Sequence, residues 1–277
     1  MSHGVGNNSR LLFVGGGNIA AAVACGLVRA GASSPKDITV CDIDSSKFDK
    51  FLQYGINVST DLDSASQGAD FIFLAVKPNV VKTVLQQLST VSCVLENSVL
   101  VSFAAAVPVS YMTDCLGRQT KIIRTMPSTP ILVGEGVIAV SKNELVSKRE
   151  FEYFCRLMSS IAHVETVDES LLNPVISVSG SSPAYVYLFI KAMLDASEKI
   201  GVPRDIALPL VLKTVKGSVT MIEKSDTSIE QLIKNVSSPN GTTLKALESF
   251  ENDDFSGAVE RAMLACLKRA DEISNEL

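Results

Sequence analysis

The sequence of 277 residues contains no tryptophan and only two histidines, His3 and His163. A reaction that needs a histidine base would therefore depend on His163, whose apolar neighbours favour a structural role near a domain edge. The six cysteines form no CxxC pair, which favours reduced thiols over disulfides and indicates no metal site. The sequence also lacks an apolar run of bilayer-spanning length and an N-terminal signal core, so we expect a cytoplasmic protein without a membrane partner.

Positively charged residues are also fewer than negatively charged ones. Lysine and arginine number 25 against 30 aspartates and glutamates, which gives a formal net charge of −5. Because there is no basic cluster either, we expect no nucleic-acid partner. Hydrophobic residues make up 46% of the chain and charged residues 20%, as in folded globular proteins, and the length allows two domains that each bury a core.

A glycine-rich motif directly follows the first apolar run. Gly15, Gly17 and Ala20 have the spacing GxGxxA. In dinucleotide-binding proteins the first glycine permits a tight turn, the second lets phosphates approach the backbone, and the small third residue lets the helix lie close to its strand. The helix start at Asn18 and Ile19 then offers N–H groups to a pyrophosphate. For this motif alone, a plain strand-to-helix turn is the alternative interpretation.

Asp42 follows the second apolar run, at the end of a predicted strand. At that place a carboxylate can accept hydrogen bonds from the adenosine ribose of NADH and repel the extra phosphate of NADPH. Asp44 adds negative charge, and the loop 42–46 has no arginine that could bind that phosphate. We therefore expect NADH to be used at least as well as NADPH.

Apolar runs alternate with helical segments through the first part of the chain, which is typical of a doubly wound sheet. The run 70–76 is almost wholly apolar, as expected for a strand that is buried on both faces. Strands are predicted at 11–14, 37–41, 55–58, 70–76, 98–103, 121–126 and 136–140, and helices between them at 19–30, 48–54, 63–68, 80–88 and 109–116. The strand 136–140 is expected to complete the sheet.

Further cofactor contacts are predicted where two of these strands end, because ligands bind at the carboxyl edge of such sheets. Lys77 is either close to the cofactor or a solvated charge. The residues at this edge are Ala75, Val76, Lys77 and Pro78 after the strand 70–76, and Ala104 and Ala105 after the strand 98–103.

From about Asp168 the strand pattern stops, and helices are predicted at 184–200, 204–224, 228–235, 243–251 and 255–275. We therefore expect an α/β Rossmann-type doubly wound nucleotide-binding domain over residues 1–167, followed by an all-α helical domain over residues 168–277. The helix 184–200 is apolar around much of its circumference. This pattern is compatible with a central core helix or with a helix that is buried in a subunit interface.

Besides the glycine motif, five segments match one known family. They are 74–78, 102–107, 124–130, 179–185 and 236–243. The first of them is shared with related reductases. The last two, Ser-Gly-Ser-Ser-Pro-Ala-Tyr and Val-Ser-Ser-Pro-Asn-Gly-Thr-Thr, are specific in this order and spacing. From residue 11 to about residue 277, the chain resembles the pyrroline-5-carboxylate reductase family.

The resemblance implies an enzyme that reduces the cyclic imine 1-pyrroline-5-carboxylate to L-proline, the last step of proline biosynthesis, with NADPH or NADH as cofactor. It also implies that the helical domain serves dimerisation and that two subunits of a homodimer share the active site. Many members of the family assemble further into rings of dimers. The helix 184–200 would then be interface rather than monomer core.

The same resemblance assigns the substrate site. Thr243 matches the family threonine whose hydroxyl hydrogen-bonds the ring nitrogen, so it is the predicted catalytic residue. Ser238, Gly241 and Thr242 lie in the loop whose N–H groups receive the substrate carboxylate. Without the resemblance, this loop would be interpreted as an ordinary capped helix start.

Two further family positions lie near the substrate or the cofactor. Glu169 is assigned to the substrate and Asn235 to the cofactor. Their alternatives are a solvated acid at a domain junction and a helix end.

Four positions depart from the family pattern. Asn240, Ser182 and Ala106 stand where glycine is usual, and Leu62 stands where an asparagine is common. We expect activity to survive, since a side chain at Asn240 can point outward if its backbone angles allow it.

Two other functions stay open on the sequence alone. One is a related two-domain oxidoreductase that acts on another imine or on a 3-hydroxyacid, with a lysine of the helical domain as acid/base catalyst. Its candidates are Lys191, Lys199, Lys213 and Lys216. The other is an NAD(P)-sensing protein without turnover.

Overall fold

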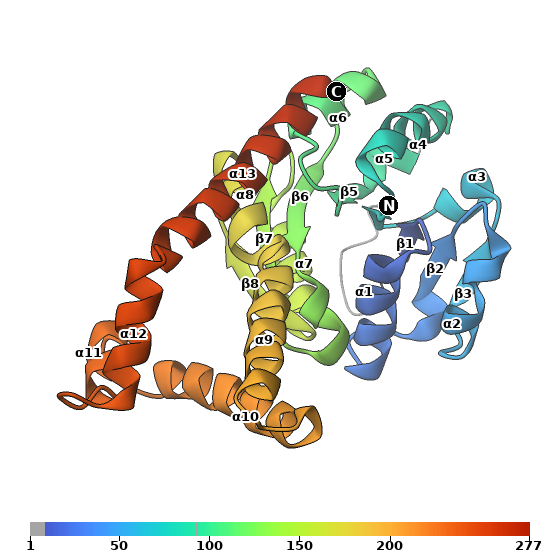
Figure 1. The fold of residues 1–277 in the computed structure, drawn as a ribbon. Coiled ribbons are helices and arrows are strands. Elements are labelled where there is room, and N and C mark those ends of the chain that lie inside the picture. Colours follow the sequence, from blue (N-terminus) through green and yellow to red (C-terminus); the bar gives the residue numbers. More distant parts are fainter. Residues whose placement is uncertain (1–8, 92–93) are drawn as a thin grey trace. The chain divides into compact units, whose positions relative to one another are not determined.

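The computed structural model describes residues 9–91 and 94–277, and it divides the chain into two compact units (Figure 1). The first unit comprises Met1–Ser181 and Cys266–Leu277, and the second comprises Ser182–Ala265. The expected division after residue 167 differs from this one by 14 residues at the boundary and by the end of the last helix. His3 and Cys93 lie outside the described residues.

Eight strands form one sheet in the described part of the first unit, in the order β3-β2-β1-β4-β5-β6-β7-β8. Neighbouring strands are parallel except for β6 and β7, which are antiparallel. The strands are β1 (Leu11–Val14), β2 (Ile38–Cys41), β3 (Asn57–Ser59), β4 (Phe71–Leu74), β5 (Val99–Ser102), β6 (Ile122–Pro127), β7 (Gly136–Lys142) and β8 (Ala162–Thr166).

The sheet is buried on both faces because its central strands are apolar at successive positions, and successive side chains point to opposite faces. In β1, Leu11 and Phe13 belong to one hydrophobic cluster, whereas Leu12 and Val14 belong to the other. The first cluster includes helices α1 (Asn18–Arg29) and α7 (Lys148–Ser159), and the second includes α3 (Leu62–Ser66), α4 (Pro78–Thr90) and α6 (Val109–Leu116). The first unit is therefore a three-layer α/β structure, as the sequence predicts.

The last part of the sheet differs from the prediction. Helix α7 and strand β8 were not predicted, and β7 does not complete the sheet because β8 pairs with it along its far edge. A short 3-10 turn, Thr129–Val133, joins β6 to β7, so the chain reverses direction and the two strands are antiparallel. His163 lies on β8, where it is exposed and its Nε2 atom is 3.2 Å from Oε2 of Glu165.

By its contacts the segment after β8 groups with the first unit, whereas the sequence predicts that the helical domain begins at residue 168. It contains a 3-10 turn (Glu169–Leu171), the short helix α8 (Leu172–Val175) and a π-helical turn (Ile176–Gly180). Ile176 packs with Ala106 and with Ala270 from the last turns of α13 (Phe255–Glu276). These tertiary contacts, which no local pattern reports, hold the segment in the first unit.

The second unit is helical throughout its secondary structure, as expected. It comprises α9 (Ser182–Lys199), α10 (Arg204–Glu223), α11 (Ile229–Asn235), α12 (Thr242–Asn252) and the first part of α13. Leu194 of α9 packs with Ala207 and Val211 of α10 in a small cluster. The unit therefore has little core of its own.

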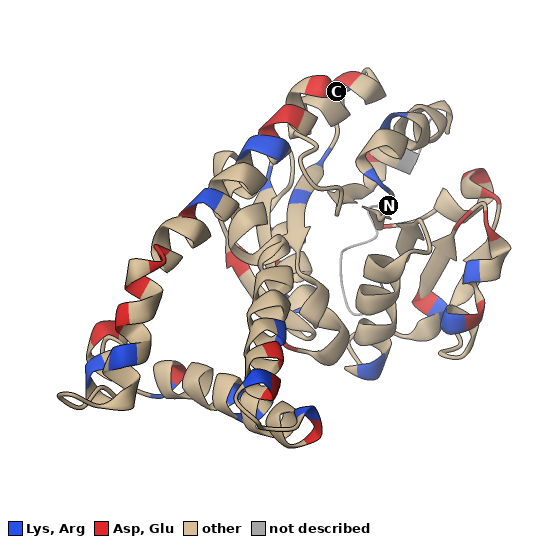
Figure 2. Cartoon of the chain, in the orientation of Figure 1, with Lys and Arg blue, Asp and Glu red and all other residues tan. Residues whose placement is uncertain are grey.

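Large apolar side chains of these helices are exposed instead. In α9 only Leu194 is buried, whereas Tyr187 and Leu188 are 62% and 67% exposed. Figure 2 shows long uncharged stretches on α9 and α10. A solvated face of this kind would be costly, which favours an interface over a monomer core for the helix that the sequence placed at 184–200.

The described cysteines Cys25, Cys41, Cys115, Cys155 and Cys266 are free thiols. Burial raises the pKa of Cys41 to about 11, and the neighbouring Asp42 adds to the effect, so this thiol is unreactive at neutral pH. Across residues 9–91 and 94–277, we find no cluster of His, Cys, Asp and Glu that could hold a metal ion. None of the described helices combines the length and the apolar character that a membrane crossing requires.

Helix α7 begins with a capping box that also carries a half-buried ion pair. Glu150 accepts hydrogen bonds from the backbone N–H and the hydroxyl of Ser147, and its Oε1 atom is 2.7 Å from Nζ of Lys121. Burial acts to raise the pKa of the Glu150 carboxyl, but the hydrogen bonds from Lys121 and Ser147 outweigh it and lower the pKa. The charged form of Glu150 therefore stabilises the fold.

Replacing Glu150 by glutamine tests this contribution. We expect E150Q to lower the free energy of unfolding by about 1–3 kcal/mol near neutral pH. Because the folded-state pKa is lowered, the contribution of Glu150 is present above its unfolded pKa of about 4.3 and is lost as the pH falls through the folded value. Urea unfolding of the wild type and of E150Q should thus show a difference in free energy of unfolding that narrows below about pH 4.

The exposed Glu152, which pairs with Lys148 on the same helix, provides the control. E152Q should change the free energy of unfolding by less than about 0.5 kcal/mol. Equal effects of the two substitutions, or a gap that does not depend on pH, would contradict the proposed role of Glu150.

Candidate functional site

The glycine turn between β1 and α1 has the shape that a pyrophosphate needs. Gly15 has a φ of +102°, and a Cβ atom at this position would lie 2.6 Å from the carbonyl oxygen of Ala75, so only glycine fits without strain. Gly17 faces open space and precedes α1 without capping the helix through a side chain. The N–H groups at Asn18 and Ile19 therefore belong to a helix start that a phosphate can approach closely.

The predicted contacts after β4 lie directly beside this turn. Ala75 donates its N–H to the carbonyl oxygen of Val14 over 2.8 Å, and a Cβ at Gly15 would also touch the side chain of Val76. Lys77 is exposed and precedes α4, which begins at Pro78. The structure thus brings the glycine motif and the end of β4 together at the carboxyl edge of the sheet.

The segment after β5 reaches the same edge. Phe103 donates its N–H to the carbonyl oxygen of Leu74, and Ala104 donates to the hydroxyl of Ser102. Ala105 is partly exposed, and the following Ala106 has a φ of +61°, in the region that favours glycine. This backbone conformation fits the expectation that glycine is usual at position 106.

Asp42 also lies at this edge, and its carboxylate is tied to the glycine turn. Its Oδ2 atom accepts the N–H of Gly16 at 2.6 Å, and its Oδ1 atom accepts the N–H of Asp44 at 2.9 Å. Lys47 contacts both oxygens, at 3.0 and 2.9 Å. The sequence interpretation considered the loop 42–46 and missed Lys47, which is only one position beyond it.

The environment keeps the Asp42 carboxylate charged. Burial acts to raise its pKa, but the hydrogen bonds from Gly16, Asp44 and Lys47 together lower it below the ordinary value. At neutral pH the group is therefore an ionised acceptor at the end of β2, where a dinucleotide places its ribose. The glycine turn, the open helix start and this carboxylate together fit a dinucleotide.

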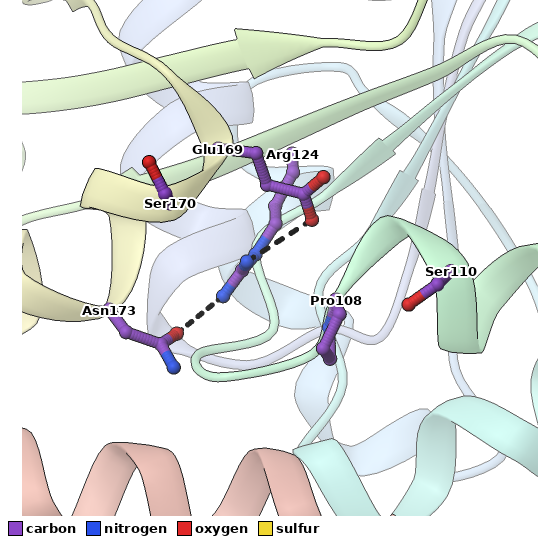
Figure 3. Close-up of a pocket in the computed structure, with 6 residues that line it drawn as sticks. All are labelled: Pro108, Ser110, Arg124, Glu169, Ser170 and Asn173. Carbon is purple, nitrogen blue, oxygen red and sulfur yellow. Dashed lines mark hydrogen bonds and ion pairs between the residues drawn. The ribbon is translucent and has the colours of Figure 1, made fainter.

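Glu169 lies elsewhere in the first unit, in a pocket of about 340 Å³ (Figure 3). Its Oε1 atom accepts the N–H of Val109 at 2.8 Å and a hydrogen bond from Arg124 at 3.2 Å. Arg124, a buried side chain on β6, also donates to the side-chain oxygen of Asn173 at 2.6 Å. In the structure Glu169 thus caps α6 and neutralises Arg124, and its contact with substrate stays a prediction.

Arg124 and Asn173 are the polar centre of this pocket, and the sequence interpretation gave them no role. Asn173 donates to Asp271 and Ser274 of α13, so the network links β6, α8 and the end of the chain. An arginine in the middle of an apolar strand was the available signal, because a buried charge requires a partner.

The predicted substrate residues of the second unit form one turn between α11 and α12. Gly241 donates its N–H to the carbonyl oxygen of Ser238 at 2.9 Å, and a Cβ at Gly241 would collide with the hydroxyl of Ser238. Asn240 has a φ of +57°, which asparagine tolerates better than most residues, and its side chain is exposed. This agrees with the expectation that Asn240 can replace glycine here.

The predicted catalytic residue lies at the end of this turn. Helix α12 begins at Thr242, so Thr243 lies in its first turn and is partly exposed, while Gly241 caps the helix without a side chain. Asn235 is the last residue of α11 and accepts a hydrogen bond from Gln231. Glu169 belongs to the first unit, whereas the other predicted substrate residues belong to the second. Asn235 belongs to the second unit, whereas the other predicted cofactor residues belong to the first.

Family models match two parts of this chain. A model described as pyrroline-5-carboxylate reductase dimerisation matches residues 169–273, and one described as NADP oxidoreductase coenzyme F420-dependent matches residues 10–106. The two models match separate parts of the chain, in the order nucleotide-binding part and then dimerisation part.

Relatives and solved structures agree with these models. The pyrroline-5-carboxylate reductases of Escherichia coli and Corynebacterium melassecola are 36% and 35% identical, over 95% of this chain and 97% and 98% of theirs. A structure of the Plasmodium falciparum enzyme with NADP bound is 29% identical, has a TM-score of 0.88 and is matched over 97% of this chain and 99% of its own. The Coxiella burnetii enzyme is 31% identical, with the same TM-score and coverage. The chain therefore belongs to the pyrroline-5-carboxylate reductase family.

Proposed function

We propose that this protein reduces 1-pyrroline-5-carboxylate to L-proline with NADPH or NADH. The observation that carries the proposal is the match to pyrroline-5-carboxylate reductases over 95% of the chain, on a fold whose glycine turn fits a dinucleotide. The same full-length match argues against a related imine or 3-hydroxyacid reductase and against a sensor without turnover. Among the lysines considered for such a reaction, Lys191 is already paired with Asp195.

The first unit would hold the cofactor at the carboxyl edge of its sheet. Gly15 and Gly17 admit the pyrophosphate, the N–H groups of Asn18 and Ile19 bind it, and the strand ends position the nicotinamide. When bound, the cofactor supplies the hydride that reduces the imine carbon. The strand-end residues proposed for this role are Ala75, Val76, Lys77, Pro78, Ala104 and Ala105; Asn235 of the second unit is proposed as a further contact.

The turn between α11 and α12 would hold the substrate. Gly241 leaves the start of α12 without a side-chain cap, so backbone N–H groups at Thr242 and Thr243 can receive the substrate carboxylate. The hydroxyl of Thr243 would hydrogen-bond the ring nitrogen and hold the imine in position, and Ser238 shapes the turn. Positioning is the main task for the protein, because a protonated imine is already electrophilic. Glu169 is proposed as a more remote contact of the substrate.

Each active site would combine the first unit of one subunit with the second unit of the other. Exposed apolar side chains on α9 and α10 support a homodimer that buries these helices. We therefore propose a dimer with a shared active site, and its further assembly into a ring of dimers. For location we propose the cytoplasm, where free thiols such as those of Cys25 and Cys155 persist.

Substitution of Thr243 tests the proposed catalytic residue. T243A should lower kcat/KM for pyrroline-5-carboxylate by about 10- to 100-fold, since a hydrogen bond to the reacting ring is lost. T243S keeps the hydroxyl and should retain most of the activity. Oxidation of NAD(P)H followed by absorbance, together with circular dichroism to confirm folding, provides the measurement. Full activity of T243A would remove the residue from the mechanism.

Cofactor choice tests the proposed position of Asp42. If its carboxylate faces the adenosine ribose, kcat/KM with NADH should be at least equal to that with NADPH. The two values are compared by steady-state kinetics on the same preparation. A preference of about tenfold or more for NADPH would show that Asp42 does not discriminate in this way.

A mixing experiment tests whether the site is shared. G17D places a negative charge where the pyrophosphate binds, and the open space at Gly17 accommodates the side chain. If one subunit provides the cofactor and the other provides Thr243, a mixed dimer of G17D and T243A has one intact site. Random exchange of equal amounts should then restore about a quarter of the wild-type activity.

The variants are unfolded together, refolded and assayed, with each variant refolded alone as control. No recovery, despite mixed dimers detected by mass spectrometry, would contradict a shared site and favour a site within one subunit.

A further inference from the structure

The carboxylate of Asp42 already has hydrogen-bond donors on both oxygens in this structure. It accepts two backbone N–H groups, from Gly16 and Asp44, and the ammonium group of Lys47 lies within hydrogen-bonding distance of both oxygens. Ribose hydroxyls at this place would therefore meet an ion pair rather than a free carboxylate. The sign of the local charge depends on Lys47 as much as on Asp42.

Lys47 is placed at the glycine turn by its own backbone. It ends the 3-10 turn Ser45–Lys47, which Asp44 caps through a hydrogen bond from the N–H of Ser46. A Cβ at Gly16 would lie 3.4 Å from both the Cβ of Lys47 and the Oδ2 atom of Asp42. The lysine stem thus begins beside the turn that would carry the pyrophosphate.

The two partners of this ion pair differ in their freedom to move. The Asp42 side chain is 7% exposed and keeps its two backbone donors whatever Lys47 does, whereas the Lys47 side chain is 40% exposed. Departure of the ammonium group would therefore leave no unpaired buried oxygen on Asp42. An exposed lysine can exchange one anionic partner for another at little cost.

We propose that Lys47 sets the cofactor choice of the enzyme, by bonding Asp42 when NADH binds and turning to the 2′-phosphate when NADPH binds. The inference rests on the proposed function and extends it, because Asp42 and Asp44 alone would repel that phosphate. Lys47 supplies the cation that the loop 42–46 lacks. Both cofactors are then accepted, and the 2′-phosphate depends on one side chain.

Direct binding to the full-length protein tests this without turnover. NADP+ and NAD+ are titrated by calorimetry into wild type, K47M, D42N and K50M. We expect K47M to weaken NADP+ by about tenfold or more and NAD+ by less than about threefold. D42N should instead raise the affinity for NADP+ relative to that for NAD+, since it removes the negative charge and releases Lys47.

K50M is the matched control, because it removes the same charge from the neighbouring helix α2 (Asp49–Leu52), where Lys50 lies over the ring of Phe51. It should leave the ratio of the two affinities unchanged. Titration of 2′,5′-ADP and 5′-AMP, which represent the adenosine ends of the two cofactors, tests the same contact alone. K47M should weaken the binding of 2′,5′-ADP and leave that of 5′-AMP unchanged. Circular dichroism confirms that each variant is folded.

The outcomes distinguish failure of this inference from failure of the proposed function. Equal weakening of NADP+ and NAD+ by K47M, or an effect on their ratio no larger than that of K50M, would overturn the role of Lys47 while leaving the proposed function intact. A wild-type protein that bound neither nucleotide would contradict the proposed function itself, and the inference with it.

Discussion

The register of three parallel strands is the constraint on which the candidate cofactor site depends. Val14 at the end of β1 lies level with Cys41 of β2 on one side and with Leu74 of β4 on the other. The residues that follow each strand therefore reach the same edge: the glycine turn, Asp42 and Ala75. A shift of register by one residue would separate these groups and move every buried side chain to the opposite face. The apolar side chains on both faces of the sheet thus hold the site together.

Buried polar groups of the first unit follow the same logic of paired charge. Asp42, Glu150 and Arg124 are each enclosed, and each is neutralised by one charged partner and further hydrogen bonds. An isolated charge in these places would be expensive, so the partner is part of the structure rather than an addition to it. The pair of Asp42 lies at the carboxyl edge of the sheet, beside the glycine turn, and its lysine side chain is 40% exposed.

Much of this arrangement could be predicted from local sequence. The alternation of apolar runs with helical segments predicted seven of the strands, and the GxGxxA spacing predicted the turn at Gly15 that the backbone angle explains. The prediction failed at α7 and β8. Ser147 and Glu150 are three positions apart and form a capping box, a signal that was present and was overlooked. Strand β8 contains polar residues at exposed positions because it lies at the edge of the sheet, so it lacks the apolar run that marked the other strands.

The sequence by itself determined the order of the elements, the dinucleotide turn and the family, because these depend on residue types at short and fixed separations. Only the tertiary structure decided that the chain stays in the first unit from Asp168 to Ser181, that Glu169 binds Arg124, and that Lys47 binds Asp42. The first two findings depend on residues that are far apart in the chain, such as Arg124 and Glu169. The third depends on how a turn directs the side chains of Asp42 and Lys47. Periodicity and spacing report what each segment can form, whereas burial and charge pairing between segments select which contacts are made.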